Sequence, residues 1–174
     1  MSVFHTIGHS TRTVSEFMAL LREARVDVVL DVRTVPRSRR NPQFNRETLP
    51  DELADAGIGY VHIPELGGLR RRKKHDGPSP NTFWENDSFR NYADYALTPP
   101  FRAGLDRLRQ LGRDRTCVIM CAEAVWWRCH RRIIADYLID AGETVFHILG
   151  PGAIEPATIN PAAIRKPEGG LVYS

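Results

Sequence analysis

The order of apolar segments along the chain is the feature that most constrains its fold. Short apolar runs that suit strands alternate with longer segments whose apolar residues recur at helical spacing, which is typical of βαβ units and a parallel sheet. The predicted strands are 3–7, 28–30, 60–63, 116–120 and 144–148, and the predicted helices are 13–24, 46–56, 88–96, 100–111 and 126–141. We therefore expect an α/β fold with a parallel or mostly parallel sheet flanked by helices in a Rossmann-like three-layer arrangement.

Local signals and length define the organisation of the chain. Thr13 and Glu16 have the spacing of a capping box, and Pro99-Pro100 separates two helices because proline suits a first turn and not a helix interior. A length of 174 residues fits one domain. We expect 1–150 to form the α/β domain and 151–174 to form a Pro/Gly-rich C-terminal extension. Within it, 162–166 and 171–173 suit a small hairpin packed on the same domain.

Composition indicates a folded protein with no membrane partner. Hydrophobic residues make up 42% and charged residues 26% of the chain, as in ordinary globular proteins. No apolar run could cross a bilayer, and the N-terminus lacks the features of a signal peptide. Three cysteines cannot all be paired in disulfides, so we expect the reducing environment of the cytoplasm. The cofactor and the oligomeric state are left open.

Positive charge is concentrated in three clusters, although the net charge is only +3. Five arginines and no acid lie in 33–46, and a third cluster lies in 128–132. The second cluster is the unbroken run Arg70, Arg71, Arg72, Lys73 and Lys74. Such a run is most often a solvated surface. Aromatic residues nearby in sequence also make it a nucleic-acid candidate, because aromatic rings interleaved with cations suit stacking on bases.

Chemically active residues follow four of the predicted strands. The carboxyl ends of parallel strands meet at one edge of a sheet, where ligands normally bind. We therefore expect one shared site, which would bind an anionic small molecule or a nucleic acid. Its candidate residues are His9, Ser10, Asp31, Arg33, Glu65, Cys121, Glu123, Cys129, His130 and Arg131.

Cys121 is the candidate reactive thiol. It is expected to lead into a helix start, where backbone N–H groups and arginines lower the pKa of a thiol. Glu123 opposes this effect unless an arginine pairs with it. The alternative is a small buried cysteine at the end of a strand. Cys117 lies in the middle of a strand and is expected in the core.

Two interpretations of Cys129 are consistent with the sequence. Cys129 either packs against the sheet beside Ile133 or forms a reversible thiol pair with Cys121. A zinc site using both thiols with His130 or His9 would have no established ligand spacing, so we assign no metal.

The remaining polar candidates have alternatives of their own. His9 suits a general acid or base, or it caps the next helix. Asp31 and Arg33 point to the same side of an extended segment, where they shape a phosphate-binding loop or act only structurally. His130 and Arg131 add positive charge near a helix start, which a bound anion would relieve. No Walker or dinucleotide fingerprint is present.

The ordered motifs resemble a known family. Thr6-Ile7-Gly8-His9-Ser10, Asp31-Val32-Arg33 with Pro36, Ile63-Pro64-Glu65-Leu66-Gly67-Gly68, Cys121-Ala122-Glu123 and Cys129-His130-Arg131 are similar to the bacterial domain of unknown function four-eight-eight. The resemblance runs from about Thr6 to Ile148 and implies an α/β fold with a shared site, but no reaction. The family often carries Asp-Pro between Glu123 and Cys129, and this chain does not.

Two functions follow from these features. The first is an enzyme acting on a phosphorylated, nucleotide or nucleic-acid substrate, with Arg33 and Arg131 on the anion, Cys121 as nucleophile or redox thiol, and His9 or Glu123 carrying the proton. The second is a noncatalytic nucleic-acid or nucleotide-binding module that uses the same basic edge. A protein-interaction domain would require the Trp126-Trp127 pair to be exposed.

Overall fold

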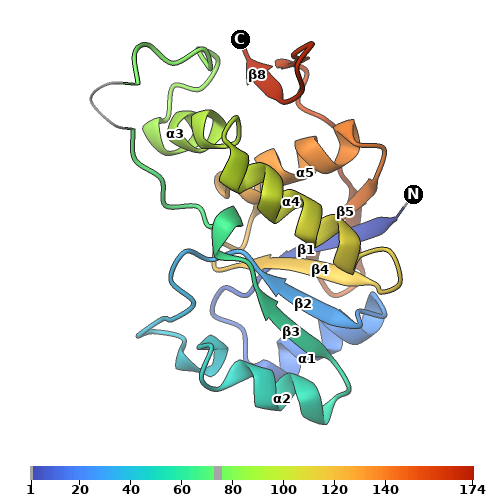
Figure 1. Ribbon diagram of the computed structural model, residues 1–174. Helices are drawn as coiled ribbons and strands as arrows, with labels where there is room; N and C mark the ends of the chain where they lie inside the picture. The colour runs from blue at the N-terminus through green and yellow to red at the C-terminus, as the bar shows by residue number, and fades with distance from the viewer. Residues whose placement is uncertain (1, 73–75) are drawn as a thin grey trace.

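A six-stranded, mostly parallel sheet is the centre of the computed structural model, which describes residues 2–72 and 76–174 (Figure 1). The strand order is β3-β2-β4-β1-β5-β6, and only β6 runs antiparallel to its neighbour. The strands are β1 (Val3–Gly8), β2 (Val28–Asp31), β3 (Gly59–His62), β4 (Cys117–Cys121), β5 (Thr144–Gly150) and β6 (Ala153–Pro156). The expected mostly parallel α/β fold is confirmed.

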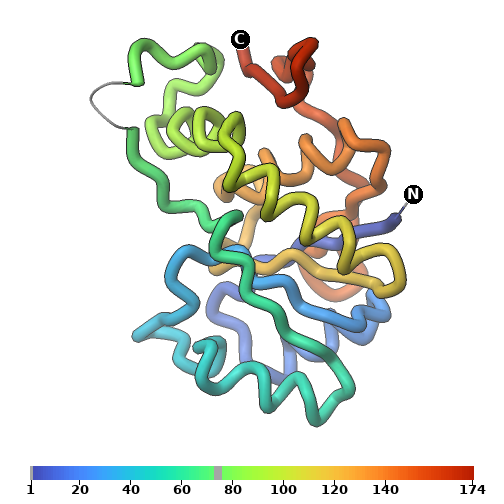
Figure 2. Tube along the Cα trace, viewed as in Figure 1, coloured from blue at the N-terminus to red at the C-terminus, as the bar shows by residue number. Residues whose placement is uncertain are grey.

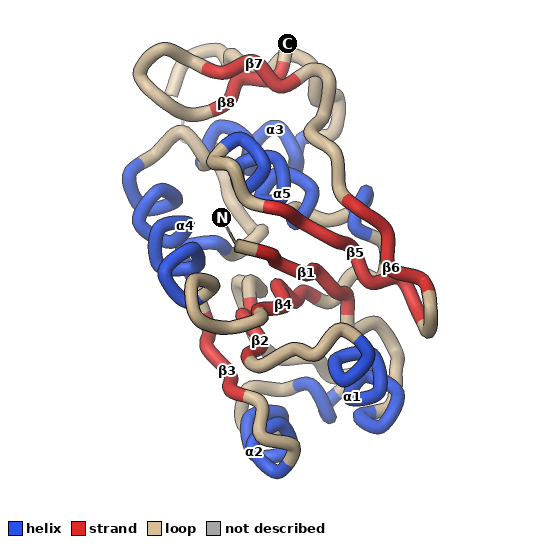
Figure 3. The backbone as a smooth tube through the Cα atoms, turned by 90° about the vertical axis from the view of Figure 1, so that its right-hand side faces the viewer, coloured by secondary structure: helices blue, strands red, loops and turns tan. Residues whose placement is uncertain are grey.

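Helices cover both faces of this sheet and complete the three layers. One face carries α1 (Val14–Glu23) and α2 (Leu49–Asp55), and the other carries α3 (Asp87–Tyr95), α4 (Pro99–Leu111) and α5 (Arg131–Asp140). Figure 3 shows the strands between these two helical layers. Side chains alternate between the two faces of a strand, so the sheet separates two apolar cores. Among the described residues, no helix has the length and apolarity needed to span a bilayer.

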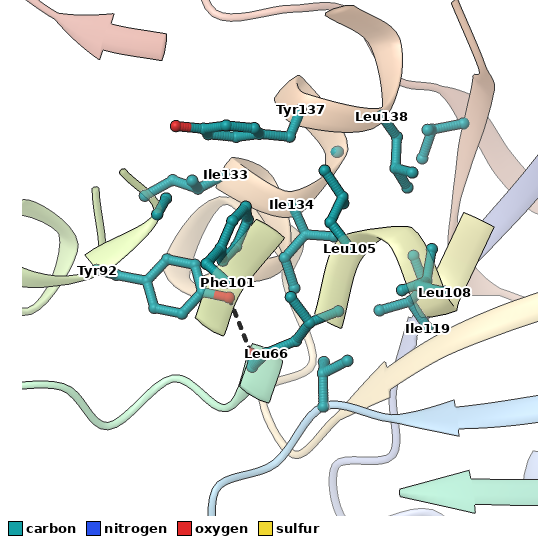
Figure 4. Packing of buried hydrophobic residues seen from close by; sticks show 14 of the residues in the cluster. Leu66, Tyr92, Phe101, Leu105, Leu108, Ile119, Ile133, Ile134, Tyr137 and Leu138 are labelled. Atoms are coloured by element: carbon teal, nitrogen blue, oxygen red, sulfur yellow. Dashed lines mark hydrogen bonds between the residues drawn. The ribbon is translucent and has the colours of Figure 1, made fainter. Parts of the chain in front are cut away.

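Tyr92 ties the larger core to the loop that follows β3. Its ring is fully buried, and its hydroxyl donates to the carbonyl of Leu66 at 2.8 Å (Figure 4). Leu66 belongs to a short 3₁₀ helix, η2 (Pro64–Leu66). Phe101 of α4 packs edge-on against Tyr92, with ring centroids 5.9 Å apart. These contacts hold the start of the 67–72 loop against α3 and α4.

The N-terminal ends of α1 and α2 have different determinants. The capping box of α1 is present, because Thr13 Oγ1 accepts from Glu16 N at 3.1 Å and Thr13 N donates to Glu16 Oε1 at 2.9 Å. The helix predicted from residue 46 begins only at Leu49. Pro50 occupies the first turn of α2, a place that proline favours, and the preceding residues form turns.

The helix predicted over 126–141 is also interrupted. Trp126–Arg128 form a separate 3₁₀ helix, η3, and α5 begins only at Arg131. Between them Cys129 is extended, with φ −126° and ψ 149°. Tertiary contacts explain the break. The Trp126 ring stacks on His147 of β5, while Cys129 is buried in the core on the α5 side of the sheet.

The C-terminal segment adds a strand that the sequence analysis did not predict. Residues of β6 pair with β5 at the edge of the sheet, and Pro156 is tolerated there because an edge strand need not donate to a further neighbour. The hairpin consists of β7 (Ala163–Arg165) and β8 (Leu171–Tyr173). The chain reaches it after β6 and ends beside α3 and α5 (Figure 2). The division at residue 150 stays a prediction.

Candidate functional site

The predicted site residues form two clusters on opposite faces of the sheet edge. The first, which we call the arginine–histidine cluster, consists of His9, Asp31 and Arg33 with Phe44 and Tyr60. The second, the thiol cluster, consists of Cys121, Cys129, His130 and Arg131 with Thr6 and His147. All lie at the carboxyl edge or beside it, but the alternation of side chains along strands separates them.

Arg33 is held by a carboxylate. Its Nε donates to Asp31 Oδ1 at 2.9 Å and its Nη2 to Asp31 Oδ2 at 2.7 Å. Nη2 also donates to the carbonyl of Phe44 at 2.7 Å, and the Tyr60 hydroxyl donates to Asp31. The positive charge of Arg33 is therefore balanced inside the protein, and the pair shapes the loop that follows β2.

His9 supports Arg33 from the end of β1. Its Nδ1–H donates to the Ser10 carbonyl at 2.8 Å, which leaves the lone pair of Nε2 facing Arg33 Nη1 at 3.3 Å. The ring stacks on Phe44 with centroids 4.5 Å apart, and Ser10 adopts a left-handed φ of 52° at this corner. Burial lowers the pKa of His9 to about 4. Both ring nitrogens are engaged, so the geometry supports a positioning role.

Arg131 is the central residue of the thiol cluster. The residue is 1% exposed, and its guanidinium donates to Cys129 Sγ at 3.4 Å, Thr6 Oγ1 at 3.1 Å and the Glu123 carbonyl at 2.6 Å. Its backbone N–H, in the first turn of α5, also points at Cys129 Sγ, at 3.5 Å. Among the residues that the structure describes, no carboxylate forms an ion pair with Arg131.

The acceptor beside the Arg131 guanidinium is the sulfur of Cys129. Burial by itself acts to raise the pKa of Cys129. The hydrogen bond from Cys121 and the charge and hydrogen bond of His130 outweigh burial and lower the pKa of Cys129 well below its usual value, and Arg131 lowers this pKa further. The start of α5 adds partial positive charge at the same sulfur. The surroundings therefore favour the thiolate form of Cys129.

Cys121 is the neutral partner of the pair. Burial, the hydrogen bond to Cys129 and the negative charge of that sulfur raise the pKa of Cys121 well above its usual value. The surroundings of the pair therefore favour a proton on Cys121 over one on Cys129. The helix start that was expected after Cys121 lies instead after Cys129, because η3 and an extended residue intervene. Cys117 is in the core as expected, and burial raises its pKa to about 11.

Two glycines are required for the thiol cluster to close. A side chain at Gly8 would collide with the carbonyl of Glu123, which accepts from Arg131. A Cβ at Gly68 would lie 2.6 Å from Nδ1 of His130. His130 donates from Nε2 to the Val32 carbonyl at 2.9 Å, and its Nδ1 lies 3.5 Å from Cys129 Sγ. The Gly67-Gly68 motif therefore lets the 67–72 loop approach His130, which lies beside Cys129.

Thr6 and His147 complete the cluster and were not singled out from the sequence. Thr6 Oγ1 and His147 Nδ1 are 2.6 Å apart on adjacent strands. Because Thr6 accepts from Arg131, its single hydroxyl proton is free to go to His147. Burial, followed by the charge of Arg131, lowers the pKa of His147 to about 4, so the ring is neutral. The available signal was a polar residue inside an otherwise apolar strand.

A basic groove lies next to the thiol cluster. Its volume is about 1050 Å³, and its lining residues include Arg70, Arg71 and Arg72 with Asp76 and Asp94, beside Gly68 and Tyr95. Arg72 Nε forms an ion pair with Asp94 at 3.1 Å. The Arg70 guanidinium stacks 3.7 Å above the Tyr95 ring. Gly68 connects the groove with His130. A smaller hollow of about 440 Å³ lies at residues 37–45 of the loop after β2. Lys73 and Lys74, which were also nucleic-acid candidates, lie outside the described residues.

The remaining predicted site residues, Glu123 and Glu65, each contribute a backbone carbonyl to a hydrogen bond. Glu123 is exposed and contributes its backbone carbonyl to Arg131. Glu65 is partly buried, and its carbonyl accepts from the Tyr95 hydroxyl at 2.6 Å. Among the described residues, no group of three or more His, Cys, Asp or Glu side chains is arranged to hold a metal ion.

The fold and the site define a mostly parallel α/β protein with a buried cysteine–arginine cluster at the carboxyl edge of its sheet. The chain belongs to the family described as Domain of unknown function DUF488, whose model matches residues 13–138. The match spans most of the chain and includes both cysteines of the cluster, whereas the motif at Thr6–Ser10 precedes it. No curated protein and no solved structure matches the chain.

Proposed function

We propose that this protein is an enzyme in which a cysteine thiolate at the carboxyl edge of the sheet acts on a phosphorylated or nucleotide substrate. The observation that carries the proposal is the burial of Arg131 without a carboxylate, with its side chain and its backbone N–H both directed at Cys129 Sγ. The thiolate is Cys129, with Cys121 as its hydrogen-bond donor. This reverses the roles that the sequence analysis favoured for the two cysteines.

The energetics of Arg131 support this assignment. Burying an unpaired guanidinium costs several kcal/mol, and buried charges in proteins are normally paired. A neutral thiol at Cys129 would leave that cost uncompensated, whereas a thiolate balances it. Thiolates beside arginine and at helix N-termini are the reactive form of cysteine.

The surrounding residues suit distinct tasks in such a reaction. Cys129 Sγ is the nucleophile, and His130 Nδ1, 3.5 Å away, is placed to carry a proton. Arg70 and Arg71 line the groove beside Gly68, which packs against His130, and would hold the substrate's anionic group. His9 and Arg33 act as positioning residues, because their polar atoms are engaged with each other and with Asp31.

Alkylation kinetics test this proposal without knowledge of the substrate. The probes are iodoacetamide, which is neutral, and iodoacetate, which is anionic, with the rate at each cysteine followed by mass spectrometry over a range of pH. We expect Cys129 to react at about pH 6, below the usual thiol pKa of about 8.5, while Cys117 stays unmodified. We also expect iodoacetate to be favoured about 10-fold more at Cys129 than at free cysteine.

Two variants distinguish the effect of the groove from that of the Cys129 thiolate. Arg71→Gln, at an exposed residue of the groove, should reduce the preference for iodoacetate and leave the pH profile of Cys129 unchanged. Arg107→Gln, on the exposed face of α4, is the matched control and should change neither. A Cys129 that reacts no faster than free cysteine at this pH, or that shows no preference for the anionic probe, contradicts the proposal.

The noncatalytic alternative is favoured by the basic groove itself. Arg70, Arg71 and Arg72 would bind a nucleotide or nucleic acid with or without chemistry at Cys129. Such binding should weaken steeply with salt and survive Cys129→Ser, whereas product formation should not. Retention of binding with no product formed from a panel of nucleotides and phosphate esters would favour this alternative.

We also propose that the protein works in the cytoplasm. All three cysteines are free in the structure, and a thiolate at Cys129 persists only where the surroundings are reducing.

A further inference from the structure

We propose that Cys121 and Cys129 form a reversible disulfide when a hydroperoxide reaches the thiol cluster. This deepens the proposed function, because it assigns regulation to the same thiolate. It does not depend on the identity of the substrate or on the groove.

The placement of the two cysteines supports this pairing. Cys121 ends β4 and Cys129 immediately precedes the start of α5, on the same face of the sheet. Arg131 connects the two sulfurs, because its guanidinium donates to Cys129 Sγ at 3.4 Å and to the Glu123 carbonyl at 2.6 Å, and Cys121 Sγ donates to the same carbonyl at 3.9 Å. A disulfide requires the two sulfurs to approach to about 2.05 Å.

The segment between the cysteines allows that approach. Cys129 has extended backbone and lies outside the regular helix. Only its carbonyl, which accepts from Arg132 N at 3.1 Å, joins its backbone to the first turn of α5. Neighbouring residues of this segment are exposed, including Glu123, Trp127 and Arg128. A hydroperoxide is small and uncharged, so it can approach the buried sulfur past this exposed segment.

The chemistry balances with one hydroperoxide. The Cys129 thiolate attacks one peroxide oxygen, the O–O bond breaks, and the sulfur becomes a sulfenic acid while the leaving oxygen takes a proton. Cys121 Sγ then attacks the Cys129 sulfur, the S–O bond breaks, and the departing hydroxide takes the Cys121 proton as water. Two thiols are oxidised by two electrons and one peroxide bond is reduced.

The environment of Arg131 makes this disulfide easy to reduce. Its reduced form contains a thiolate that balances the buried guanidinium, and the disulfide is neutral. Oxidation therefore leaves Arg131 without its counter-charge. A disulfide whose reduced form is stabilised in this way is strongly oxidising and is readily reversed by cellular thiols. It suits a switch that turns the Cys129 nucleophile off, and it does not suit a structural bridge.

Mass spectrometry of the full-length protein tests the inference. The reduced protein is treated with hydrogen peroxide, free thiols are blocked with N-ethylmaleimide, and the chain is digested with trypsin. Trypsin cleaves after Arg115, Arg128 and Arg131, so the expected product links the peptide 116–128 to the peptide 129–131. The first of these peptides contains both Cys117 and Cys121. The Cys117→Ser variant therefore identifies the partner, and it should form the link as fast as the wild type.

Cys121→Ser retains a donor to Cys129 but cannot form the disulfide. In this variant we expect peroxide to stop at the Cys129 sulfenic acid, which dimedone traps, and we expect glutathione to restore the wild-type disulfide to free thiols. Absence of the linked peptide in the wild type, a link through Cys117, or resistance of the link to glutathione would each overturn the inference.

The outcome is separable from that of the alkylation experiment. Preference of Cys129 for iodoacetate without a disulfide would leave the proposed function and remove this inference. A disulfide without that preference would leave this inference and remove the proposed function.

Discussion

Two buried arginines at the carboxyl edge of the sheet have counter-charges of different kinds. Arg33 has the carboxylate of Asp31 in a two-point contact, whereas Arg131 has the sulfur of Cys129. A carboxylate is charged at neutral pH wherever an arginine is near. A thiol is charged only if its surroundings favour the thiolate, and the interactions of Cys129 with Cys121, His130 and Arg131 act in that direction. This difference is why the thiol cluster is the stronger candidate for chemistry.

At the residue scale, we predict that His9 makes stability fall in mild acid. Its folded-state pKa is about 4, below the unfolded value of about 6.5, so the unfolded chain binds more protons between these values. The stabilisation is present above about pH 6.5 and is lost as the pH falls towards 4, and it amounts to about 3 kcal/mol. Urea unfolding at a series of pH values measures it.

His9→Gln is the variant for this prediction. It should flatten the pH dependence relative to the wild type between about pH 6.5 and 4, whatever its effect at neutral pH. Ser15→Ala, at an exposed residue of α1 that carries no titratable group, is the comparison and should keep the wild-type slope. An unchanged slope in His9→Gln would show that the ring is not held neutral.

At the scale of the elements, helix starts decide which side chains are available for chemistry. The start of α1 is determined by neighbours in sequence, Thr13 and Glu16, whose hydrogen bonds close on each other. The start of α5 is determined by residues far away, because Trp126 is held by His147 and by Glu155 of β6. The first kind of boundary can be predicted from a local pattern, and the second cannot.

We predict that Thr13→Ala lowers the free energy of unfolding by about 1 kcal/mol, because it removes the side-chain acceptor of the capping box. Ser15→Ala lies in the same turn and is exposed, with no role in the cap, and should change stability by less than about 0.5 kcal/mol. Chemical denaturation measures both. Equal effects of the two substitutions would mean that the box contributes nothing beyond the helix itself.

At the scale of the whole molecule, the C-terminal hairpin is joined to the main domain by buried contacts. Tyr173 of β8 is buried, its ring lies 5.2 Å from that of Trp84, and its hydroxyl donates to Asp136 Oδ2 at 2.8 Å. Asp136 also accepts from the backbone N–H of Asn160 at 3.0 Å. The last residues of the chain therefore contribute to the core on the α5 side.

We predict that Tyr173→Phe destabilises the protein by about 1–3 kcal/mol, because a buried carboxyl loses a donor. Burial raises the pKa of Asp136 to about 6, above the unfolded value of about 3.9. The group therefore favours folding when protonated, and this stability is lost as the pH rises through about 6. Tyr173→Phe removes a donor to the charged form, so its effect should be larger at about pH 8 than at about pH 5.

The control for this substitution is Ile164→Ala, at an exposed residue of β7 in the same hairpin. It should have a small effect that is the same at both pH values. Thermal or chemical unfolding measures the difference. A pH-independent loss in Tyr173→Phe would indicate that the hydroxyl does not preferentially stabilise the charged form of Asp136.

The sequence by itself determined the fold class, most of the strands and helices, and the gathering of polar residues at one edge of the sheet. These follow from local periodicity and from the rule that parallel strands end together. Only the tertiary structure decided which face each of those residues occupies. A shift of one residue along a strand reverses the direction of a side chain. His9 and Arg33 therefore belong to one core and Cys121 to the other.

The tertiary structure alone also decided which of Cys121 and Cys129 has surroundings that favour the thiolate. The charge of a thiol depends on donors and cations within a few ångströms, and for Cys129 these come from β4, from the segment before α5 and from α5 itself. Spacing along the chain places Cys121 and Cys129 equally well. Folding distinguishes them, because the side chain and the backbone N–H of Arg131 both donate to Cys129 Sγ, whereas Cys121 Sγ donates to the Glu123 carbonyl.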